Sequence, residues 1–199
     1  MKKKTKEGFG MEQQLREHLM EGEQLLWSGR PEAFETLDKT NKSSIITGLV
    51  IKLLVTIGLL VVYVISARDN SVPIKPGVIV AILALAAVAL ANPFLIARRL
   101  RRKTVYGLTD KRVLRSGVFD QAIPYERIRS AELRTDEDGH TSLLCGPRSA
   151  GLKPRKWRGE AEASFIDNRD EPEAARVIFY AIPVSEEVKG LLKQYLPIK

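Results

Sequence analysis

Two apolar stretches decide the fold of this chain: residues 45–66 read IITGLVIKLLVTIGLLVVYVIS, and residues 77–97 read GVIVAILALAAVALANPFLIA. The first contains one charged residue, Lys52, and the second contains none. At a rise of about 1.5 Å per residue, a helix of either length matches the roughly 30 Å hydrocarbon core of a bilayer. A soluble helix of that length would carry a polar face, and neither stretch has one. We therefore predict two transmembrane helices.

The connection between the two stretches, residues 67–76, reads ARDNSVPIKP and is short and rich in turn-forming residues. The two helices are therefore expected to be antiparallel neighbours. Near the end of the second stretch, Asn92 and Pro93 predict a local bend, because proline removes a helical hydrogen bond.

The charge distribution predicts the orientation of this hairpin. The formal net charge is +8, and four lysines near the start of the chain and five cations after the second stretch, less Glu7, account for all of it. The five cations are Arg98, Arg99, Arg101, Arg102 and Lys103. Cytoplasmic flanks of membrane proteins carry such an excess, so both termini are expected in the cytoplasm and the protein in the inner (plasma) membrane. This distribution does not indicate a nucleic-acid partner.

Lys52 has two interpretations. An ionisable residue within a span is a functional candidate, for instance in a transport or channel assembly. It also lies about two turns from the cytoplasmic end, so its side chain can extend to the interface. The sequence favours the second interpretation and leaves both open.

After the hairpin the signals are those of short strands followed by one amphipathic helix. The sequence thus predicts three segments: a cytoplasmic N-terminal segment over 1–43, the hairpin over 44–97 and a mainly-β domain over 98–199. Trp27 in the first segment suits either the lipid headgroups or the β domain. Ser185 has the character of the helix N-cap. The predicted strands cover 104–108, 112–118, 121–123, 128–134, 142–145, 163–166 and 176–182.

Several motifs resemble one known family. A Y-x-L-T-D-x-R run follows the hairpin, and GEQLLWSGRP at 22–31 is similar to a G-E-x-x-x-W-x-G-x-P opening. Phe179, Ile182, Ser185, Val188 and Leu192 are similar to the closing strand and helix. In this order the motifs resemble the bacterial pleckstrin-homology (PH) proteins called membrane-flanked domain proteins. The run itself comprises Tyr106, Leu108, Thr109, Asp110 and Arg112.

The resemblance implies a bent antiparallel sheet of seven strands, partly closed as a barrel, with a C-terminal helix at one open end. The segment GPRSAGLKPRKWRGE, residues 146–160, is longer and more basic than the family pattern. No catalytic or ligand-binding residue follows from the resemblance.

An enzyme needs a constellation of reactive side chains, and the sequence offers none. His140 lies in an acidic turn without a nucleophile motif or metal-ligand spacing. Asp110 and Arg112 are expected to hold a strand turn and to pair with neighbours. Cys145 is the one cysteine, so no intramolecular disulfide can form, and it is expected to be a small strand residue. We expect neither catalysis, nor a cofactor, nor a metal.

A basic segment is the best candidate for a binding surface. Clustered cations beside an aromatic residue suit anionic lipid headgroups, and the alternative is a solvated loop whose tryptophan covers one end of the barrel. The expected function is a non-catalytic, membrane-anchored PH-like module that binds a protein partner, a second copy of itself or anionic lipid; the alternative is a small subunit of a transport or channel assembly. The lipid-contact candidates are Arg148, Lys153, Arg155, Lys156, Trp157 and Arg158.

Overall fold

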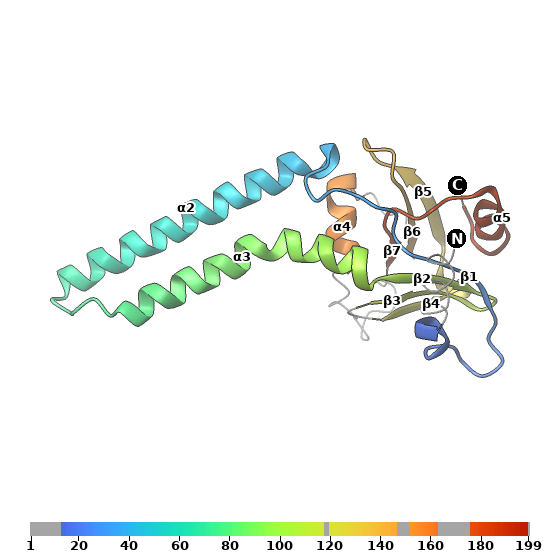
Figure 1. Ribbon diagram of the computed structural model, residues 1–199, viewed down its shortest axis with the longest axis horizontal. Helices are drawn as coiled ribbons and strands as arrows, with labels where there is room; N and C mark the ends of the chain where they lie inside the picture. The colour runs from blue at the N-terminus through green and yellow to red at the C-terminus, as the bar shows by residue number, and fades with distance from the viewer. Residues whose placement is uncertain (1–12, 118–119, 147–151, 163–175, 199) are drawn as a thin grey trace, which may run out of the picture. The chain divides into compact units, whose positions relative to one another are not determined.

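The computed structural model describes residues 13–117, 120–146, 152–162 and 176–198. The chain divides into two compact units (Figure 1). The hairpin unit is Thr36–Leu95, and the β unit combines Met1–Glu35 with Ile96–Lys199. The hairpin is therefore an insertion into the chain of the β unit.

The hairpin unit consists of the helices α2 (Lys39–Asp69) and α3 (Pro76–Lys103), of which α3 continues into the β unit. The Asp38 carboxylate caps α2 by accepting a hydrogen bond from the Asn41 backbone N–H at 2.8 Å. The two helices run side by side in Figure 1, and at the turn the Tyr63 hydroxyl accepts a 2.8 Å hydrogen bond from the Lys75 backbone. The expected pair of antiparallel helices is confirmed.

Both helices are long and apolar enough to cross a membrane, and their apolar stretches are not buried within the structure. Each helix extends beyond the apolar run that predicted it. The first turn of α2 is polar, and α3 continues through the basic flank to Lys103. Helix length is thus set by capping and by packing beyond the spans, as well as by hydrophobicity.

The β unit contains two antiparallel sheets whose strands run in different directions (Figure 1). The first has the order β1 (Leu25–Gly29), β2 (Val105–Thr109), β3 (Arg112–Ser116) and β4 (Gln121–Pro124). The second has the order β5 (Ser130–Thr135), β6 (Thr141–Gly146) and β7 (Val177–Phe179). A short 3-10 helix, Tyr125–Arg127, connects the sheets, and the helices of this unit are α4 (Pro154–Glu162) and α5 (Glu186–Tyr195).

The strands β6 and β7 of the second sheet are buried on both faces, and their side chains alternate between two hydrophobic clusters. Leu143 and Cys145 face the main core together with residues of the first sheet and of α5, including Val188 and Leu192. Leu144 belongs to the other cluster, which contains Phe34, Ala97, Leu100, Trp157, Ala161, Ile178, Tyr180 and Ala181. Because strand side chains alternate in direction, one sheet can hold both the main core and the end of α3.

Most of the predicted strands and the final helix are confirmed. Ser185 caps α5, and its hydroxyl accepts a hydrogen bond from the Val188 N–H. Cys145 lies buried in β6 as expected, and burial raises the pKa of its thiol to about 12. The strand predicted over 163–166 lies outside the described residues.

Two elements differ from the expectation. The N-terminal segment is not separate, because β1 pairs with β2 and the described residues up to Glu35 belong to the β unit. Trp27 packs against the main core, over Gly29, where an added Cβ would collide with the indole. The basic segment was expected to be a loop, and residues 154–162 instead form the helix α4, with Pro154 at its first position.

Candidate functional site

The motif residues of the Y-x-L-T-D-x-R run form an ionic latch with the segment that precedes the hairpin. The Glu23 carboxylate accepts hydrogen bonds from Arg112 Nε at 2.8 Å, Arg112 Nη2 at 2.9 Å and the Thr109 hydroxyl at 2.7 Å. It also accepts one from the Met20 backbone N–H at 2.8 Å. The Glu23 side chain has no exposed surface. We call Glu23, Thr109 and Arg112 the latch; it fastens β1 to the turn between β2 and β3.

The latch changes the acidity of Glu23. Burial by itself would raise the pKa of this carboxyl. The hydrogen bonds from Arg112, from Met20 and from Thr109 outweigh burial and lower the pKa from 4.5 to about 2. Glu23 is therefore held in its ionised form at neutral pH.

The other polar residues of the run also serve the fold. Asp110 Oδ1 accepts a 2.9 Å hydrogen bond from the Gln24 N–H, and the Asp110 N–H donates to the Gln24 carbonyl. The Tyr106 hydroxyl joins the two sheets: it accepts from the Tyr180 N–H at 2.9 Å and donates to the Tyr180 carbonyl at 3.0 Å. The expected role of Asp110 and Arg112 in holding the turn is confirmed, and their contacts give no catalytic geometry.

Two of the lipid-contact candidates are buried, which corrects the expectation for them. Trp157 is 1% exposed, and its indole N–H donates to the Leu152 carbonyl at 3.0 Å. Arg158 is 4% exposed and lies over the rings of Phe34 at 4.5 Å and Tyr180 at 5.2 Å. Its guanidinium donates to the Glu35 carbonyl and to the Tyr180 hydroxyl. Both side chains fix α4 to the β unit and do not face solvent.

Three further cations of the segment are exposed. Lys153, Arg155 and Lys156 lie on the outside of this region, and Arg148 lies outside the described residues. The end of α3 adds further exposed cations, and its Ala97 and Leu100 share one hydrophobic cluster with Trp157 of α4. The end of α3 and the helix α4 therefore pack on the same hydrophobic cluster, and both present exposed cations. We define this basic surface as Arg98, Arg99, Arg102, Lys103, Lys153, Arg155 and Lys156.

One cavity of about 190 Å³ opens between residues 13–18 and the strands β3 and β4. Its polar lining includes Arg112 of the latch and the pair His18 and Asp120, whose Nε2 and Oδ2 atoms lie 3.5 Å apart. Gln121 also lines it, and among the described residues no hydrogen-bond partner lies near the Gln121 Oε1. No local pattern in the sequence predicts this cavity, because its lining combines residues from before and after the hairpin.

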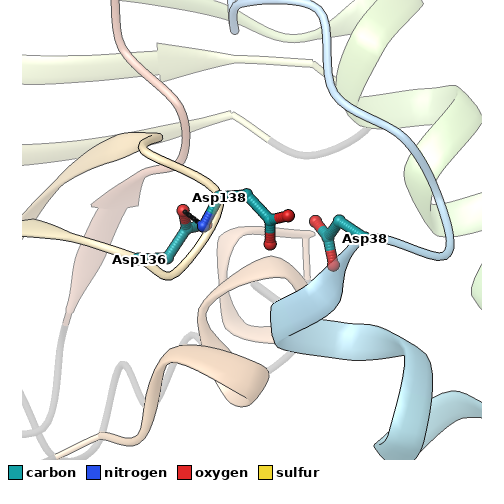
Figure 2. A group of neighbouring side chains, drawn as sticks. All are labelled: Asp38, Asp136 and Asp138. Carbon is teal, nitrogen blue, oxygen red and sulfur yellow. Dashed lines mark hydrogen bonds between the residues drawn. The ribbon is translucent and has the colours of Figure 1, made fainter.

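The acidic turn between β5 and β6 is built by its own hydrogen bonds. Asp136 Oδ1 accepts from the Asp138 N–H at 3.0 Å, drawn in Figure 2, and from the His140 N–H at 2.9 Å. Gly139 has a φ of +84°, which glycine adopts without strain. Asp136 and Asp138 belong to the β unit, whereas Asp38 belongs to the hairpin unit. Among the described residues of each unit, no group of three side chains is placed to hold a metal ion. Asp38, also labelled in Figure 2, caps α2 in the hairpin unit.

A comparison with known proteins finds no family model, no curated protein and no solved structure that matches this chain. The fold and the described contacts therefore define the class of protein directly. It is a hairpin of two long apolar helices joined to a two-sheet β unit with a C-terminal helix.

Proposed function

We propose that this protein is a non-catalytic binding module anchored by two membrane spans at the inner face of the cell membrane. The observation that carries the proposal is the pairing of β1, which precedes the hairpin, with β2, which follows it. Paired strands must lie on the same side of a membrane, so the chain between them crosses it an even number of times. Two apolar helices satisfy this condition.

The cytoplasmic orientation is supported by the cations at both flanks of the hairpin. The connection between α2 and α3 contains Arg68 and Lys75, whereas five cations follow the second apolar stretch directly. Basic residues are retained on the cytoplasmic side, so the β unit would face the cytoplasm.

A PH-like identity for the β unit is supported by the order of its elements. Four antiparallel strands are followed by three and then by a helix whose Val188 and Leu192 enter the main core. The resemblance implies antiparallel strands followed by a C-terminal helix, and this coarse order agrees with it; the strands form two sheets here, and β1 comes from before the hairpin. The non-catalytic role is supported by the latch, because Thr109 and Arg112 are engaged in structural contacts.

The ligand we propose for the basic surface is the anionic headgroup of membrane lipids. Arg98 directly follows the second apolar stretch, so the end of α3 would lie at the headgroups of a spanned bilayer. The helix α4 shares a hydrophobic cluster with this end of α3 and presents Arg155 and Lys156 to solvent. Each cation near an anionic surface contributes about 1 kcal/mol, and salt screens the attraction.

The experiment uses the full chain in lipid nanodiscs with a dye on a cysteine at the exposed position 160, in a Cys145→Ala background. Nitroxide-labelled headgroups should quench the dye more in anionic than in neutral nanodiscs, and salt should reduce the difference. Combined Lys153→Gln, Arg155→Gln and Lys156→Gln changes should remove it. The matched control replaces Lys111, Arg127 and Lys193, three exposed cations on other elements, by glutamine. Equal quenching in the parent and in the α4 variant would refute the lipid contact.

A further inference from the structure

Lys52 is the one charged residue within the two apolar stretches, and it contacts the opposite helix. Its ammonium Nζ donates a 2.8 Å hydrogen bond to the backbone carbonyl of Ala89. Lys52 lies in α2 and Ala89 in α3, both within the hairpin unit. A lysine side chain thus joins the two helices through a backbone acceptor.

The identity of this acceptor follows from Pro93, which lies inside α3. In an α-helix the carbonyl of each residue accepts a hydrogen bond from the N–H four residues later. The residue four positions after Ala89 is Pro93, which has no N–H to donate. The Ala89 carbonyl therefore lacks its helical donor, and Lys52 supplies one.

A bilayer makes this pairing favourable for both partners. A backbone carbonyl without a donor costs several kcal/mol in hydrocarbon, where water cannot replace the missing bond. A lysine within a span also costs free energy, because its charge loses water. The contact reduces both costs at once.

The two partners also lie at matching depths. Lys52 is seven residues inside the start of the first apolar stretch, and Ala89 is eight residues before the end of the second. At 1.5 Å per residue, both positions are about 10 to 12 Å from the same end of the hairpin. An antiparallel pair places them side by side without a shift in register.

We propose that Lys52, Ala89 and Pro93 form an interhelical clasp that closes the hairpin at the carbonyl that Pro93 leaves without a helical donor. The clasp rests on the membrane location proposed above. It assigns Lys52 a positioning role in the helix pair, in place of a role in an ion pathway.

The test is a double-mutant cycle between Lys52→Met and Pro93→Ala on the full chain. Spin labels at the exposed positions 50 and 88, in a Cys145→Ala background, report the separation of the helices during a mild SDS titration. Lys52→Met should raise the ratio of open to closed hairpin about 3- to 15-fold, the range of measured interhelical hydrogen bonds in membranes. In Pro93→Ala the residue at 93 regains its N–H and bonds Ala89, so Lys52→Met should then have much less effect.

Two further variants serve as controls for the double-mutant cycle. Lys42→Met removes a cation at the start of the same helix and should leave the ratio unchanged, whereas Lys52→Arg keeps a donor and should restore most of the closure. An effect of Lys52→Met that is equal in both Pro93 backgrounds, or no greater than that of Lys42→Met, would overturn the clasp. Resistance of each variant to carbonate extraction is measured separately, so a failure of the membrane proposal is recognised on its own. Removing a charge or a proline from an apolar helix does not impair its insertion.

Discussion

Glu23 is held in its ionised form by partners that come from distant parts of the chain. The three hydrogen bonds from Arg112 and Thr109 link residues that are 86 to 89 positions apart. A group whose folded pKa lies below its unfolded value contributes stability above the unfolded pKa and loses it as the pH falls through the folded pKa. For Glu23 the two values are 4.5 and about 2.

We predict that Glu23→Gln destabilises the β unit and reduces its sensitivity to acid. The pKa difference corresponds to a free energy of unfolding on the order of 3 kcal/mol, present at neutral pH and lost between about pH 5 and pH 2. Chemical unfolding followed by aromatic circular dichroism should show that the parent loses more stability than Glu23→Gln in this range. Glu126→Gln, at an exposed position, is the control and should behave as the parent. Parallel pH profiles for the parent and Glu23→Gln would contradict the prediction.

For Arg112 the sequence predicted that the side chain pairs within a strand turn, but it did not predict the partner residue. The position of Arg112 in a strand turn favours pairing with a neighbour, which the structure confirms. Glu23 could not be assigned, because no local pattern connects it with a residue beyond two apolar helices. The contact of Lys52 with Ala89 is similar, although Pro93 marks the carbonyl that lacks a donor.

The helix α4 has a buried side that packs on the β unit and an exposed side that carries cations. Trp157 and Ala161, four positions apart, lie on its buried side with Arg158, whereas Arg155 and Lys156 are exposed. This spacing is that of one helix face, and Pro154 suits the first turn. The sequence carried both signals, but its clustered cations suggested a solvated loop, because a core tryptophan cannot be recognised without its partners.

Trp157→Ala should therefore destabilise the β unit by about 3 to 5 kcal/mol, as expected for the loss of a large buried aromatic side chain. Arg155→Ala, on the exposed side of the same helix, should change the free energy of unfolding by less than about 0.5 kcal/mol. The buried thiol of Cys145 offers the measurement, because a maleimide reaches it only when the unit opens. Similar denaturant profiles of Cys145 labelling in these two variants would show that α4 is not held by its tryptophan.

The helices of the hairpin and the strands β2 to β6 were predictable for a physical reason. Their signals are local: a continuous apolar run for a span and alternation between turns for a strand. For β1 the sequence showed only a short apolar piece. Its pairing with β2 joins residues about eighty positions apart along the chain, so no local pattern predicts it. Neither the sheet order nor the cavity beside β4 could be inferred from the sequence.

For the whole molecule, the hairpin topology predicts which sites face the outside of the cell. A cysteine at Asn70, in the turn between α2 and α3, should react with an impermeant thiol reagent in intact cells. A cysteine at the exposed Glu137 should react only after lysis; this position avoids strain at Gly139. Both variants carry Cys145→Ala. Labelling of position 137 before lysis, with position 70 protected, would reverse the orientation.

The insertion of the hairpin between β1 and β2 also has a consequence for biosynthesis. The ribosome produces β1 first, yet its pairing partner emerges only after both apolar helices have been made. The first sheet can be completed only when those helices have left β1 and β2 in one compartment. A nascent chain with one helix misinserted would keep β1 and β2 apart and expose the apolar edge of an incomplete core. In the topology proposed above, assembly of the β unit therefore depends on the insertion of both helices.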